Sequence, residues 1–117
     1  MEELRKTYHH ELESARAELA RLAALVAELI PRATAVLLDG DLEGAEYIIR
    51  GDEDIDARCV ELEEACLRIL ALQAPVAGEL RQVVALMKMV SEVERSGDLV
   101  RNICKAARRI YGHDLDP

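Results

Sequence analysis

A heptad pattern of apolar residues begins at Tyr8 and continues to Val36, through the stretch YHHELESARAELARLAALVAELIPRATAV. The apolar positions alternate in steps of four and three, which is typical of a helix with one buried seam; they are residues 8, 12, 15, 19, 22, 26, 29, 33 and 36. Pro31 removes one backbone hydrogen bond, but the seam continues beyond it, so we expect a kink and not an end. The pattern predicts a first helix over residues 3–38.

A second seam follows the turn Asp39-Gly40-Asp41, in which the glycine can end one helix and Asp41 can cap the next. It predicts a helix over residues 41–73 whose seam consists of Ala45, Ile48, Asp52, Ile55, Cys59, Leu62, Cys66 and Ile69.

A third seam predicts a helix over residues 75–111, with Pro75 in its first turn. Its stripe consists of Leu80, Val83, Met87, Val90, Glu94, Gly97 and Cys104. Because both connections are short, consecutive helices should be antiparallel. We therefore expect an all-α, antiparallel three-helix bundle that forms one domain over residues 1–117.

The composition agrees with this fold class and excludes several functions. The chain has no Phe or Trp, so its core must be aliphatic. A net charge of −8 argues against nucleic-acid binding. No apolar run approaches the roughly 20 residues that span a bilayer, and the acidic N-terminus is unlike a secretory signal. The odd count of three cysteines favours reduced core thiols and a cytoplasmic location.

Two acidic pairs interrupt the apolar seams. Asp52 and Glu94 occupy seam positions, and each has a second acid four residues later, Asp56 and Asp98. Like charges at this spacing destabilise a helix by about 0.2–0.5 kcal/mol, so the pattern needs a reason. The two pairs lie at similar distances before and after the predicted turn at Ala74. In an antiparallel hairpin they should therefore lie at the same height on neighbouring helices.

Four carboxylates at one level must either raise one another's pKa values or bind a cation. Oxygen ligands suit Mg²⁺, Mn²⁺ or Ca²⁺, with iron and zinc as alternatives. We therefore predict a metal site, its ligands being Asp52, Asp56, Glu94 and Asp98. The alternative interpretation is a solvated acidic face that binds nothing.

Catalytic motifs are missing from the sequence. No Glu-x-x-His motif supports a ferritin-like di-iron site, and neither a nucleophile elbow nor a glycine-rich phosphate loop occurs. We expect a protein that is not an enzyme; a metal-dependent phosphohydrolase is the least favoured interpretation.

Residues 72–81, LQAPVAGELR, are followed by Val93-Glu94-Arg95-Ser96-Gly97-Asp98 and by Asn102-Ile103. Together with residues 8–12 and the acids of residues 52–56, they resemble the PhoU family of phosphate-signalling proteins. Glu79 stands where the family usually has Asp, and Ser96 where it usually has an apolar residue.

The resemblance covers essentially the whole chain. It implies a three-helix bundle in the cytoplasm that negatively regulates phosphate uptake and the phosphate-starvation response. It also implies a phosphate ABC transporter and a sensor histidine kinase as partners, and metal binding at Glu/Asp-x-x-x-Asp motifs. Those motifs fall on the same four residues, Asp52, Asp56, Glu94 and Asp98.

Members of this family usually carry two such bundles, and this chain holds one. Either the chain is half of a longer protein, or it pairs with a second copy, and we expect a homodimer. A metal-free helical interaction module is the alternative to a metal-binding adaptor.

Overall fold

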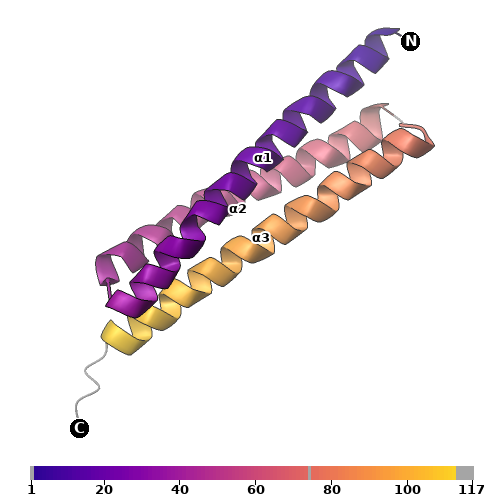
Figure 1. The fold of residues 1–117 in the computed structure, drawn as a ribbon. Helices are drawn as coiled ribbons and strands as arrows, with labels where there is room; N and C mark the ends of the chain where they lie inside the picture. The colour runs from indigo at the N-terminus through magenta and orange to yellow at the C-terminus, as the bar shows by residue number, and fades with distance from the viewer. Residues whose placement is uncertain (1, 74, 113–117) are drawn as a thin grey trace.

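The computed structural model describes residues 2–73 and 75–112, which form three long antiparallel helices (Figure 1). The helices are α1 (Glu2–Asp39), α2 (Leu42–Gln73) and α3 (Ala77–Gly112), and no strand occurs in the described residues. They pack along their lengths into a bundle of 71 × 18 × 18 Å. The expected all-α three-helix architecture is confirmed. Ala74, where the second turn was expected, and residues 113–117 lie outside the described residues.

The core consists largely of the seam residues that the heptad pattern predicts. All eight seam positions of α2 are buried, Asp52 included. On α1, Leu19 and Leu29 are half-buried and the other seam residues are buried. On α3 the buried residues recur at the alternating three- and four-residue steps of a single seam; they are Val83, Leu86, Val90, Gly97, Val100, Cys104 and Ala107, with the half-buried Val93 completing the pattern. The predicted stripe is therefore wrong at Met87 and Glu94, which are only partly buried. Leu80, which was expected on the stripe, lies in the first turn of α3 and is 42% exposed.

α1 runs through Pro31 without ending. The proline leaves the carbonyl of Ala27 without its helical donor, but both residues are exposed, so water can hydrogen-bond that carbonyl. Beyond the proline, Ala33 and Val36 are buried in the core. Tertiary packing therefore keeps the chain helical across this position.

The turn between α1 and α2 has the predicted chemistry. Gly40 has a φ of 69°, and its N–H donates to the carbonyl of Val36 at 2.9 Å, which ends α1. The Oδ1 of Asp41 accepts from the N–H of Gly44 at 3.0 Å, which caps α2. The end of α3 packs over this turn, because the hydroxyl of Tyr111 donates to the carbonyl of Leu37 at 2.8 Å.

α3 begins at Ala77, two residues later than expected, so the prediction that Pro75 opens the first helical turn is wrong. Val76 caps the helix instead. Its carbonyl accepts from the N–H of Leu80 at 2.7 Å, and its own N–H donates to Oε1 of Glu79 at 3.4 Å. The carboxylate of Glu79 thus adds a long, solvent-exposed hydrogen bond to the N-terminal cap of α3.

Ion pairs outside the acidic stretches also join the helices. Arg58 on α2 donates two hydrogen bonds to Glu18 on α1, at 3.0 and 2.8 Å, and holds the pKa of that carboxyl below its ordinary value. Arg108 on α3 donates to Glu46 on α2 at 2.9 Å and likewise lowers the pKa of Glu46. These ion pairs link α2 to both neighbouring helices.

Candidate acidic site on helices α2 and α3

The two acidic pairs meet at one level of the bundle. Asp52 and Asp56 are on α2, and Glu94 and Asp98 are on the antiparallel α3. The carboxyls of Asp56 and Asp98 both lie close enough to Glu94 to raise its pKa, and those of Asp98 and Asp56 do the same for Asp52. The hairpin register therefore brings together the four residues that the sequence selects.

Asp52 and Asp98, called here the bridged pair, share one guanidinium group. Nη1 of Arg101 donates to Oδ2 of Asp52 at 2.8 Å and lies 3.3 Å from Oδ1 of Asp98. Asp52 is 5% exposed. Burial raises the pKa of Asp52, and the opposing effect of Arg101 does not fully cancel the rise. A core carboxylate is thus held next to an internal cation.

Asp56 and Glu94, called here the unbridged pair, have a different environment. Among residues 2–73 and 75–112, neither of them forms an ion pair with a basic side chain, and the same is true of the neighbouring Glu63. The pKa of Glu94 is raised, first by burial and then by Glu63, Asp56 and Asp98. Negative charge accumulates here without an internal counter-ion.

The backbone of Gly97 lies beside the bridged pair. A Cβ atom added at Gly97 would be 3.4 Å from Oδ1 of Asp52 and 3.8 Å from side-chain atoms of Ile55 and Val26. All three helices therefore meet at this level. Since these distances are ordinary van der Waals contacts, a lack of space for a Cβ atom does not explain why residue 97 is a glycine.

The three cysteines are buried core residues, as expected. Cys59 lies in the core near the acidic side chains. Its burial, and to a smaller extent the charges of Glu94 and Asp56, raise the pKa of its thiol to about 11. In the cation-free fold the thiol therefore stays protonated at neutral pH.

Two residues of this site are not among the predicted ligands. Arg101 follows Asp98 by three residues and continues the predicted stripe between Gly97 and Cys104, although the buried residue at this turn is Val100. Glu63 follows Asp56 by two helical turns and therefore shares its face of α2. The periodicity shows which face of its helix each residue occupies but does not show which groups its side chain contacts.

The donor set suits a hard cation only in part. Carboxylate oxygens are the ligands that Mg²⁺, Mn²⁺ and Ca²⁺ prefer, and the unbridged pair offers them without a competing base. In the bridged pair, however, Arg101 already occupies oxygens that a metal would need. Within the described part of the chain, no group of three or more His, Cys, Asp or Glu side chains is close enough together to hold an ion. The four-ligand assignment stays a prediction.

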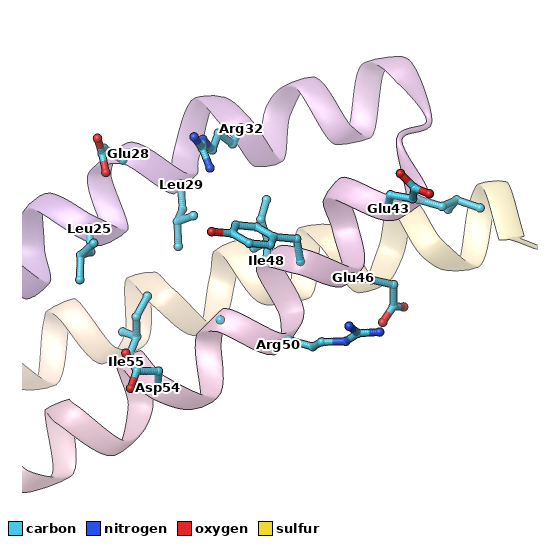
Figure 2. Close-up of a pocket in the computed structure, with 13 residues that line it drawn as sticks. Leu25, Glu28, Leu29, Arg32, Glu43, Glu46, Ile48, Arg50, Asp54 and Ile55 are labelled. Atoms are coloured by element: carbon cyan, nitrogen blue, oxygen red, sulfur yellow. The ribbon is translucent and has the colours of Figure 1, made fainter.

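An open groove lies elsewhere, between α1 and α2, with a volume of about 1050 Å³ (Figure 2). Figure 2 shows Leu25 and Leu29 of α1 on one side and Ile48 and Ile55 of α2 on the other. Charged side chains also line it, among them Arg32 and both acids and bases of α2. None of the four predicted ligands lines this groove.

Comparison with known proteins connects these features to one family. The family model described as the PhoU domain matches residues 19–107, a range that contains all four predicted ligands, Glu63 and Arg101. The chain belongs to the PhoU family.

Curated PhoU proteins align with most of the chain. The phosphate-specific transport system accessory protein PhoU homolog of Aquifex aeolicus is 41% identical over 97 residues, which are 83% of this chain and 44% of that protein. PhoU homolog 1 of Mycobacterium leprae is 40% identical over 114 residues, 97% of this chain and 51% of that protein. PhoU of Serratia marcescens is 34% identical over 110 residues, 94% of this chain and 45% of that protein. The chain thus spans about half the length of these relatives.

None of the helices in the described residues combines the length and the apolar character needed to cross a membrane.

Proposed function

We propose that this chain is an accessory unit of phosphate transport: a non-enzymatic helical adaptor that binds a metal ion and negatively regulates phosphate uptake and phosphate-starvation signalling. Two observations support the proposal. The relatives named above are phosphate-specific transport system accessory proteins. The acids predicted as ligands lie together at the junction of α2 and α3.

The proposed partners are a phosphate ABC transporter and a sensor histidine kinase, contacted from the cytoplasmic side. We also propose that two copies of the chain associate to form the working unit. Removal of the gene should leave a phosphate-starvation promoter active in high phosphate, and re-expression of the chain should silence it. A promoter that stays repressed without the gene would argue against the regulatory role.

The observation that carries the metal part is the unbridged pair, where carboxylates crowd without a basic partner among the described residues. A bound cation would neutralise this charge and remove the mutual repulsion. Elemental analysis should find metal in protein purified without chelator or added metal, and much less in Glu94→Ala and Asp98→Ala.

Glu92→Ala is the matched control, because Glu92 is an exposed acid on the same helix that pairs only with Arg95 among the described residues. It should retain the metal content of the unmodified chain. Equal metal in all four proteins would remove the ligand assignment while leaving the regulatory role to be judged by the promoter experiment.

A metal-free interaction module is the second candidate, and the groove between α1 and α2 favours it. Its apolar side chains, including the 68% exposed Tyr47, offer a docking surface for another helix. Thermal unfolding discriminates the two candidates. A cation at 100 times its Kd stabilises the fold by about 2.7 kcal/mol, whereas a module without a site shows no shift with Mn²⁺, Mg²⁺ or iron.

A further inference from the structure

Arg101 makes its contacts with the bridged pair in an unusual way. A single nitrogen, Nη1, faces both carboxylates, at 2.8 Å from Asp52 and 3.3 Å from Asp98. The two-pronged hydrogen bonding that makes arginine–carboxylate pairs strong is not formed with either acid. Within the described residues, Nε of Arg101 is buried without a hydrogen-bond partner. The guanidinium therefore sits between two acids but is held there suboptimally.

The charge environment explains why a cation is nevertheless needed at this point. The side chain of Asp52 is only 7% exposed, so its ionised form requires a positive neighbour. Among the described residues, Arg101 is the basic side chain that pairs with it. The side chain of Arg101 is 30% exposed, so the arginine can turn toward solvent if another cation takes its place.

We propose that Arg101 is a built-in competitor for the metal site: its guanidinium occupies Asp52 and Asp98 in the cation-free fold, and an ion that takes these carboxylates displaces it. The inference rests on the proposed metal binding and adds the group that limits its affinity. A divalent ion and a guanidinium cannot share these oxygens without strong repulsion. Cation binding thus moves the α3 side chain that links α3 to the core acid of α2.

The test compares Mn²⁺ affinity in three proteins by calorimetric titration. Arg101→Gln removes the competing charge and should bind Mn²⁺ about tenfold more tightly than the unmodified chain. Arg95→Gln is the control, because Arg95 is an exposed arginine on the same helix that pairs with Glu92 and not with the site. Its affinity should change by less than about twofold, since the charge of a solvent-exposed side chain is screened.

Each outcome decides the matter. If the unmodified chain binds Mn²⁺ and Arg101→Gln binds it no more tightly, competition is refuted while metal binding stands. If both glutamine variants tighten binding equally, net charge and not Arg101 is responsible, and the inference is again refuted. If neither the unmodified chain nor Arg101→Gln binds Mn²⁺, the proposed metal binding fails, and the inference fails with it.

Arg101→Gln leaves Asp52 without its partner and could unfold the chain. In that case Mn²⁺ should restore its helical circular dichroism, because the ion replaces the lost positive charge. A variant that stays unfolded in millimolar Mn²⁺ would overturn the inference. Arg101→Lys keeps the charge and should stay close to the unmodified chain in Mn²⁺ affinity; a tenfold tightening there would also count against competition by charge.

Discussion

Replacing either member of the Asp52–Arg101 pair should change stability in opposite directions. Asp52 occupies a core seam position, where its 7% exposed side chain carries a charge. Losing one partner of a buried ion pair typically costs 3–5 kcal/mol, because the other charge is left uncompensated. Since the Arg101 side chain is 30% exposed and water can reach the site, we expect Arg101→Leu to destabilise the fold by about 2–3 kcal/mol.

Asp52→Leu should have the opposite effect. It removes the buried charge and fills the seam with an apolar side chain, for which full burial contributes about 1.5–3 kcal/mol. Arg101 keeps Asp98 at 3.3 Å and its access to solvent, so little is left unpaired. We expect a net gain of about 1–2 kcal/mol, and the double variant should be at least as stable as the unmodified chain.

Urea denaturation followed by circular dichroism at 222 nm, in EDTA to remove cations, measures all four proteins. The differences in midpoint, multiplied by a common m-value, give the coupling between the two residues. The reasoning is refuted if Arg101→Leu stays within about 0.5 kcal/mol of the unmodified chain, or if Asp52→Leu is clearly destabilised. Either result would mean that Asp52 is not a strained core charge held by Arg101.

Further expectations concern single groups. The raised pKa of Glu94 means that its carboxyl holds a proton more tightly in the folded state than in the unfolded chain. The free energy of unfolding therefore falls as pH rises from about 4.5 through the raised pKa. We expect Glu94→Gln to stabilise the fold at pH 7 but not at pH 4. A gain of equal size at both pH values would exclude this cause. The lowered pKa of Glu18 has the opposite effect, because its ionised form stabilises the fold. Glu18→Gln should lower the free energy of unfolding by about 0.5–1 kcal/mol at pH 7, and this difference should disappear as pH falls below the ordinary pKa of glutamate. A difference that persists in acid would show that packing, and not charge, is involved. Gly40→Ala should cost about 1–2 kcal/mol in thermal unfolding, because the residue has a φ of 69° and its new methyl group would lie 3.1 Å from the ring of Tyr111; an unchanged midpoint would contradict the strained turn.

The sequence predicted most of the fold because the heptad spacing of apolar residues and the positions of the turn residues agree along the chain. The seam of α2 is buried at every predicted position, and Gly40 and Asp41 make the turn that their residue types favour. The start of α3 was misplaced because proline is compatible with the first helical turn but does not determine it. At the observed start, the N–H of Val76 donates to the side chain of Glu79, a contact that periodicity does not report.

The candidate site was likewise predicted only in part. The equal height of the acidic pairs follows from residue numbers and a short connection, and the pKa interactions of Glu94 with Asp56 and Asp98 agree with it. The internal counter-ion was missed because long side chains on α3 can point along several directions, and spacing alone does not choose among them. The place of Arg101 on the predicted stripe indicates a contact with Asp52 only once Asp52 is known to be buried on the facing side of α2.

The central claim, that the acids of α2 and α3 share a bound ion, is tested most directly by anomalous diffraction at the manganese edge from crystals grown with Mn²⁺. We predict an anomalous peak between the two helices, within coordination distance of carboxylate oxygens of the four acids Asp52, Asp56, Glu94 and Asp98, with the side chain of Arg101 turned away from Asp52. Ordered carboxylates with no peak between them, or a peak only at an unrelated surface position, would contradict the claim.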